Sequence, residues 1–160
     1  MLEPWRDFGV AVTGASAALV GLLYVAISIN LRQIVGTSVL PARALLALVL
    51  LVVPLVSTIL LLVPQPPVAL GVELLVVACT AGPCLAHLVR PSARPAQQTV
   101  AERAAGTVLP AGLTVAGTLV AGVLLLAGYP AGVYGVVVAA LAAFTGALAG
   151  TWVLLIEILR

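Results

Sequence analysis

Five long apolar runs, separated by short polar or proline-rich breaks, dominate the pattern of hydrophobic and polar positions along the chain. Each run reaches the ~20 residues that an α-helix needs to cross the ~30 Å hydrocarbon core of a bilayer. The pattern therefore predicts an all-α integral membrane bundle of five transmembrane helices, forming a single transmembrane domain over residues 1–160. The predicted spans cover approximately residues 8–31, 42–63, 67–89, 104–127 and 131–159.

Composition agrees with this pattern. Hydrophobic residues make up 63% of the chain and charged residues 8%, whereas about 25% of the residues in soluble domains are charged. The net charge of +2 comes from scattered arginines, which argues against a nucleic-acid surface. There is no lysine, and alanine, glycine, valine, leucine and arginine dominate, which is typical of a GC-rich bacterial genome. We therefore expect a multi-pass protein of the bacterial inner (plasma) membrane.

The arginines predict the orientation of the spans. They are Arg32 and Arg43 around the first loop, Arg90, Arg94 and Arg103 in or beside the third, and Arg160 at the end of the chain. The second and fourth loops carry no charge, and Arg6 near the N-terminus is outnumbered by Glu3 and Asp7. Because cytoplasmic loops are enriched in arginine and lysine, the N-terminus should lie outside and the C-terminus in the cytoplasm.

The third span carries polar residues along one face. Glu73, Thr80, Cys84 and His87 fall, together with Val77, within about 80° of arc on an α-helix. A carboxylate in a lipid-spanning segment costs roughly 2.5–3.5 kcal/mol at the helix centre, so this face should point at protein or water. Glu73, Thr80 and His87 are therefore candidates for an ion or solute path.

Each of these candidates has a structural alternative. Glu73 could bind a cation or proton, or it could be held by a partner such as Arg6, a tyrosine hydroxyl or a free backbone amide. His87 could make a proton or anion contact on the inner side, or it could be an interfacial histidine satisfied by lipid headgroups. Thr114 and Thr118, which share a face of the fourth span with Thr107, could line a solute path or form hydrogen bonds between helices.

Several polar residues should lie at one cytoplasmic level. They are Asn30, Arg32, Arg43 and His87. This group could form an inner polar mouth, or it could be a belt of side chains that snorkel to the membrane interface.

Small residues recur at helical spacing in the first and last spans, a pattern that lets membrane helices approach closely. We expect these positions to pack against other helices of the bundle or against another subunit, and the glycine-free second span to face lipid over much of its surface. The predicted packing positions are Gly14, Ala18, Gly21, Gly135, Ala139, Ala143, Gly146 and Gly150.

The start of the chain carries a further pattern. Trp5 and Phe8 precede the run from Gly14 to Leu31, and Leu40-Pro41-Ala42-Arg43-Ala44-Leu45 follows. These segments resemble a class of small multi-span bacterial inner-membrane proteins of unestablished function, some of which carry an automatic label as modulators of a membrane-bound protease. The resemblance covers about the first third of the chain. It implies a small helical bundle in the inner membrane and carries no catalytic residues.

No pattern points to catalysis, so we expect no enzyme activity, no metal and no cofactor. The spacing of Cys79 and Cys84 suits neither a redox pair nor a zinc site. The hypothesis we favour is a homo-oligomeric channel or pore for a small ion or solute. One alternative is a non-enzymatic accessory or regulatory subunit bound to a larger membrane protein. A small secondary transporter is a weaker idea, because no inverted repeat is evident.

Overall fold

Helices make up nearly all of the described part of the chain in this computed structural model, which describes residues 3–36, 40–89 and 104–158. Those ranges contain no strand, and the all-α prediction is confirmed. In chain order the elements are η1 (Glu3–Trp5), α1 (Arg6–Ile29), α2 (Leu31–Val35), α3 (Leu40–Leu62), α4 (Pro67–Leu88), the π-helical turn η3 (Ala104–Val108), α6 (Leu109–Leu126), η4 (Pro130–Gly132) and α7 (Val133–Ile158).

Five helices in the described ranges are long and apolar enough to span a membrane, as predicted: α1, α3, α4, η3 continued by α6, and η4 continued by α7. The first of them, α1, ends at Ile29, two residues before the predicted boundary, and Asn30 separates it from the next helix. The side-chain amide of Asn30 donates to the carbonyl oxygen of Ala26 at 2.9 Å, and its backbone N–H donates to the same oxygen at 3.3 Å. The short helix α2 then continues the chain to Val35.

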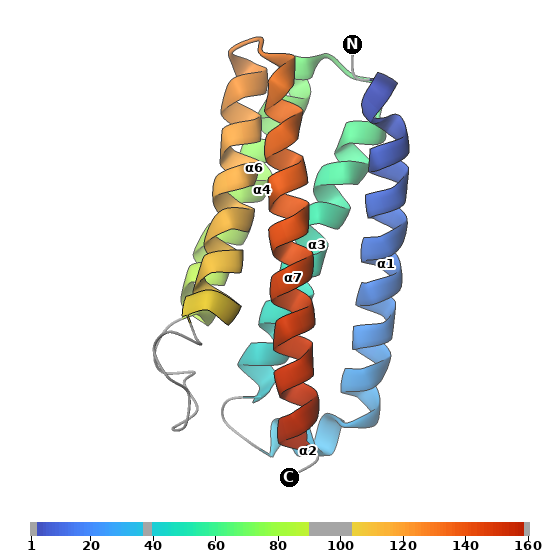
Figure 1. Ribbon diagram of the computed structural model, residues 1–160, viewed down its shortest axis with the longest axis vertical. Coiled ribbons are helices and arrows are strands. Elements are labelled where there is room, and N and C mark those ends of the chain that lie inside the picture. Colours follow the sequence, from blue (N-terminus) through green and yellow to red (C-terminus); the bar gives the residue numbers. More distant parts are fainter. Residues whose placement is uncertain (1–2, 37–39, 90–103, 159–160) are drawn as a thin grey trace.

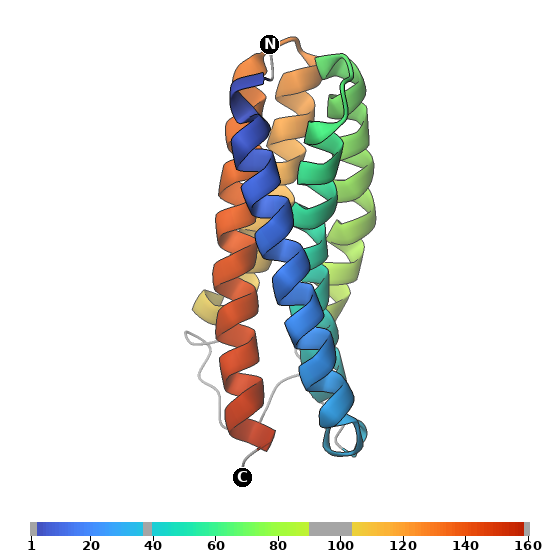
Figure 2. The ribbon, with the colours of Figure 1, turned by 90° about the vertical axis from the view of Figure 1, so that its right-hand side faces the viewer.

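The five long helices run alternately up and down (Figure 1). Helix α3 packs against α1, α4 and α7, and α6 packs between α4 and α7. Helix α1 lies across one side of the bundle (Figure 2). The end of the bundle that holds Trp5, Gln65 and Tyr129 is called the outer end below, following the orientation that the arginines predict. The opposite end is called the inner end.

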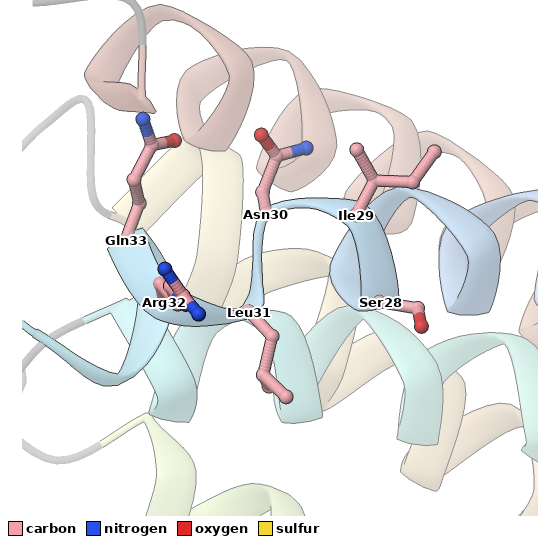
Figure 3. A pocket seen from close by; sticks show the side chains of 6 residues that line it. All are labelled: Ser28, Ile29, Asn30, Leu31, Arg32 and Gln33. Carbon is pink, nitrogen blue, oxygen red and sulfur yellow. The ribbon is translucent and has the colours of Figure 1, made fainter.

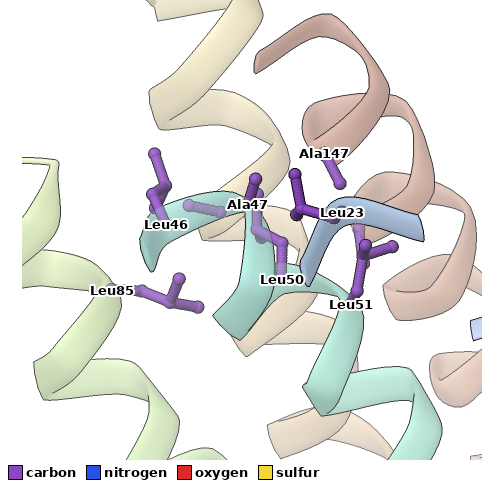
Figure 4. Close-up of a cluster of buried hydrophobic side chains, with 9 residues drawn as sticks. Leu23, Leu46, Ala47, Leu50, Leu51, Leu85 and Ala147 are labelled. Carbon is purple, nitrogen blue, oxygen red and sulfur yellow. The ribbon is translucent and has the colours of Figure 1, made fainter. Parts of the chain in front are cut away.

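The expectation that the second span faces lipid is wrong. In the apolar window of α3, 44% of the residues are buried inside the bundle, compared with 11% in α1. Large side chains of α3 fill the space between its neighbours, where Leu46, Leu50 and Leu51 pack with Leu23 of α1 and Leu85 of α4 (Figure 4). A helix without glycine can therefore be central, because its leucines supply the core volume.

Glycines set the distance between the helices in the other half of the bundle. A Cβ atom added at Gly117 of α6 would lie 2.7 Å from the carbonyl oxygen of Gly135 in α7. A Cβ atom at Gly71 of α4 would lie 2.9 Å from the carbonyl oxygen of Gly122 in α6. Since real Cβ atoms essentially never come this close to backbone, α4, α6 and α7 touch backbone to backbone at these points.

The turn between α6 and η4 also depends on a glycine. Gly128 has a φ angle of +81°, which favours glycine over residues with a side chain. Its N–H donates to the carbonyl oxygen of Leu125, and that of Tyr129 donates to the carbonyl oxygen of Leu124. This pair of hydrogen bonds is a Schellman motif, and it ends α6 at the outer end.

Candidate functional site

The polar residues of α4 lie outside the core of the chain. Thr80, Cys84 and His87 are exposed and Glu73 is half-buried. The buried residues of α4 lie on another side of the helix, roughly 120° around from these polar residues; they are Leu70, Gly71, Leu74, Ala78 and Leu85. We call Glu73, Thr80, Cys84 and His87 the polar face of α4. Together with Val77 these residues follow one another at spacings of four, three, four and three, the periodicity of a helix–helix seam.

Glu73 has a partner that the sequence analysis missed. The side-chain amide of Gln65 donates one hydrogen bond to Oε2 of Glu73 at 2.7 Å and another to the carbonyl oxygen of Leu60 at 2.9 Å. Gln65 lies in the proline-rich turn between α3 and α4, so the two hydrogen bonds link the end of α3 to the first turns of α4. The sequence signal that could have identified this partner is Gln65 itself, the one polar side chain in a turn that otherwise consists of prolines.

This linkage predicts a measurable energetic coupling. We expect Gln65→Leu to lower the free energy of unfolding by about 1.5–3 kcal/mol, because a hydrogen bond to a carboxylate is lost in a partly buried setting. Glu73→Gln should cost less, since the new amide can still accept from Gln65. Unfolding of the purified protein by SDS in mixed micelles would measure both values.

A double-mutant cycle provides the control for this prediction. If the two side chains act as a pair, Gln65→Leu combined with Glu73→Leu should cost less than the sum of the two single changes. Strict additivity would show that the 2.7 Å contact contributes nothing to stability.

The remaining residues of the polar face present their side chains at the surface. The hydroxyl of Thr80 donates to the carbonyl oxygens of Val76 and Val77 at 2.9 and 3.0 Å, within its own helix. His87 lies in the last turn of α4. Cys84 is a free thiol, and so is Cys79, which is also exposed but projects about 140° away around the helix. The structure therefore brings Glu73, Thr80 and His87 onto one outward face.

The threonines of α6 lie elsewhere. Thr114 and Thr118 are buried, with exposures of 0% and 1%. The hydroxyl of Thr114 donates to the carbonyl oxygen of Pro110 at 2.8 Å and to that of Ala139 in α7 at 3.4 Å. Thr118 donates to the carbonyl oxygen of Thr114 at 2.8 Å. These hydroxyls are satisfied by backbone in the packed α6–α7 contact, and they share no surface with the polar face of α4.

A second polar contact, between the half-buried Thr13 and the buried Thr58, links α1 and α3. The hydroxyls of Thr13 and Thr58 are 2.8 Å apart, and Thr58 also donates to the carbonyl oxygen of Pro54 at 2.7 Å. The hydroxyl oxygens of Ser16 and Ser57 are buried and form no hydrogen bond. The sequence pattern does not single out these residues, because hydroxyl side chains are common in packed membrane helices.

The residues of the predicted inner polar mouth are distributed over three helices and the bend between α1 and α2. Asn30 and Arg32 line a pocket of about 470 Å³ at the bend between α1 and α2, together with Ser28 and Gln33 (Figure 3). Arg32 is exposed, whereas the amide of Asn30 is bonded to the helix backbone. Neither Arg43 nor His87 lines this pocket. Arg43 is half-buried in the first turn of α3.

The predicted packing positions divide between the inside and the outside of the chain. Ala139, Ala143 and Gly146 of α7 are buried and Gly135 is half-buried, against α6 and α3. By contrast, Gly14, Ala18 and Gly21 of α1 are exposed, and an added Cβ atom at either glycine would meet no atom within 4 Å. An added Cβ atom at Gly150 of α7 would likewise meet no atom within 4 Å. Gly14, Ala18 and Gly21 therefore lie on an exposed side of α1, whereas Gly9 of the same helix is buried and packs on Leu61 and Leu62 of α3.

Within the described ranges, no group of three or more His, Cys, Asp or Glu residues is placed to hold a metal ion. No protein-family model, curated protein or solved structure matches this chain. The resemblance of the first third of the sequence therefore stays a prediction.

Proposed function

We propose that the protein is a homo-oligomeric channel or pore for a small ion or solute, in which the polar face of α4 lines a path shared between copies. One observation supports this most directly: three of the four residues of that face are exposed on a membrane-spanning helix. A face with a carboxylate, a hydroxyl, a thiol and an imidazole is costly against lipid tails and should meet protein or water.

The described interior of a single chain offers no comparable row of polar side chains that could line an ion or solute path. Its buried hydroxyls at Thr58, Thr114 and Thr118 are bonded to backbone in tight helix contacts. Backbone contacts at Gly117–Gly135 and Gly71–Gly122 hold α6 directly against α7 and against the outer part of α4. A path formed between copies avoids this closed core and uses the polar residues that the fold leaves outside.

Each residue of the polar face would have a defined depth in such a path. Glu73 would contribute one carboxylate per copy near the outer mouth, held in position by Gln65. Rings of carboxylates favour cations, so we expect a small cation to pass more readily than an anion. Thr80 would line the middle of the path, and Cys84 and His87 would line its inner part. The predicted location is the bacterial inner membrane.

The two native cysteines provide the test. In the Cys79→Ala variant only Cys84 remains, on the polar face, and in the Cys84→Ala variant only Cys79 remains, about 140° away on the same helix. We expect oxidation, or a short bismaleimide linker, to join copies of the Cys84-only protein in intact membranes. The Cys79-only protein should stay monomeric on denaturing gels, which makes it the matched control.

The mass of the protein in nanodiscs, from native mass spectrometry or light scattering, completes the test. The proposal expects a closed ring of three or more copies. A monomer would contradict the shared path, and so would cross-linking that is equally efficient at Cys79 and Cys84.

One observation favours the second candidate, an accessory or regulatory subunit of a larger membrane complex. The small residues Gly14, Ala18 and Gly21 leave an exposed, open strip on α1 that would accept the helix of a partner. A protein that purifies as a monomer and is stabilised by a co-purifying membrane protein would favour this candidate over the channel.

A further inference from the structure

The pocket at the bend between α1 and α2 combines four polar side chains with two apolar ones (Figure 3). Its volume of about 470 Å³ is within the usual range of ligand pockets of roughly 300–1,000 Å³. Because Asn30 separates the two helices, a run of consecutive residues lines the pocket. They are Ser28, Ile29, Asn30, Leu31, Arg32 and Gln33.

Helix α2 is anchored to α3, and this anchor fixes the shape of the bend. Ile34 is 2% exposed and packs with Leu40 of α3 in a buried cluster. The backbone N–H of Ile34 donates to the carbonyl oxygen of Asn30 at 3.0 Å, which ties α2 to the end of α1. Arg32 precedes Ile34 by two residues and therefore projects about 160° away from the anchored side of α2.

The pocket offers hydrogen-bond donors and one positive charge. Arg32 and Gln33 are exposed, and neither side chain is bonded to another described residue. Asn30 uses one amide hydrogen for the carbonyl oxygen of Ala26, and its amide carries a second. Arg32 supplies the charge of the lining, which contains no carboxylate. Since a guanidinium can donate two parallel hydrogen bonds to the oxygens of a phosphate, this set of donors suits a phosphate group.

An exposed apolar strip of α1 leads to the pocket. Leu22, Val25 and Ile29 are exposed, and their spacing places them within about 60° of arc on the helix. In the apolar window of α1 11% of the residues are buried, so this strip meets lipid tails in a bilayer. Ile29 also lines the pocket. An acyl chain that lies along the strip therefore ends at the polar donors.

We propose that this pocket binds the phosphate group of an anionic phospholipid, one acyl chain of which lies along the exposed strip of α1. Arg32 pairs with the phosphate, and the amides of Asn30 and Gln33 donate to its other oxygens. The positive charge selects an anionic over a zwitterionic headgroup, and the apolar strip selects a lipid over free phosphate. The site is independent of the proposed channel function, because none of its residues belongs to the polar face of α4.

Native mass spectrometry of the purified protein with phosphatidylglycerol and phosphatidylethanolamine of identical acyl chains tests the site. We expect Arg32→Gln to lower the ratio of retained phosphatidylglycerol to phosphatidylethanolamine by about fivefold, the effect of one basic side chain at an anionic surface. Arg6→Gln is the matched control, because Arg6 is exposed at the outer end of α1 and does not line the pocket. It should leave the ratio unchanged. Equal ratios in the two variants would overturn the proposal.

Two further measurements identify the ligand. Gln33→Glu lowers the net charge by one, as Arg6→Gln does, but places a carboxylate beside the phosphate, so it should lower the ratio as Arg32→Gln does. An unchanged ratio would show that the phosphate binds elsewhere. Excess inorganic phosphate should displace no more phosphatidylglycerol than chloride at the same ionic strength. Stronger displacement by phosphate would make a soluble anion the ligand and overturn the assignment to a lipid.

Discussion

Gly135→Ala is expected to destabilise the folded protein by about 2 kcal/mol or more, within the usual cost of overpacking a core, and Gly135→Leu should prevent folding. A Cβ atom at Gly135 would lie 2.5 Å from the carbonyl oxygen of Gly117 and 2.9 Å from the backbone nitrogen of Ala121. Both obstacles are backbone atoms of α6, so no change of rotamer relieves them. Helices α6 and α7 would have to separate.

The chain contains a local reporter for this separation. Trp5 packs edge-to-face on Tyr134, the neighbour of Gly135, with ring centroids 4.8 Å apart. In a Trp152→Phe background, the fluorescence of Trp5 during thermal or SDS unfolding therefore monitors the outer end of α7. A lower transition midpoint for Gly135→Ala is the expected result.

The control is the same substitution at Gly112, in α6 and on its exposed side, where an added Cβ atom meets nothing within 4 Å. Gly112→Ala should leave the midpoint unchanged or raise it slightly, because alanine has the higher helix propensity. If the two variants behaved alike, close backbone packing would not be what joins α6 to α7.

The sequence predicted the helices well because a bilayer leaves few choices. Backbone groups in lipid must be hydrogen-bonded within the chain, so an apolar run of sufficient length becomes a helix. The proline-rich turn after α3 and the Gly128 turn after α6 then limit where helices end. The main deviation was the break at Asn30 between α1 and α2, because length and hydropathy do not register the interruption of a helix at one residue.

Which face of each helix is buried was not predictable in the same way. Lipid tails are as apolar as leucine, so hydrophobic patterning does not separate a lipid-facing surface from a core surface. The glycines of α1 and α7 follow similar spacings, yet Gly14 is exposed and Gly146 is buried. Small residues indicate that a close approach is possible, and the partner that makes the approach depends on the whole bundle.

In the candidate site, too, the features that depend on a single helix were predictable, and those that depend on how separate elements pack were not. The polar face of α4 depends only on helical periodicity, and the structure places Thr80, Cys84 and His87 on one exposed side. The partner of Glu73 depends on how the turn between α3 and α4 returns the chain, and Gln65 was therefore missed. The burial of Thr114 against Ala139 likewise follows from the packing of α6 on α7.

Thr80→Trp is expected to reduce cation flux through the reconstituted protein to the background of empty liposomes. Thr80 is exposed in the middle of the polar face, so each copy in a closed ring would add one indole at the same depth of the shared path. A constriction of this kind blocks passage by bulk and by excluding water. Potassium-driven or thallium-driven flux into dye-loaded proteoliposomes measures the effect, with Thr80→Ser as the conservative variant that should stay active.

Cys79→Trp is the matched control, because Cys79 is also exposed and lies at nearly the same depth but 100° further around the helix. It adds the same bulk to α4 on a side that faces away from the proposed path, and its flux should be retained. Equal melting temperatures of the two variants would show that lost flux is not lost fold. If both variants conduct like the unmodified protein, α4 does not line the path. If both are inactive yet folded, the assignment of the path to one face of α4 is wrong.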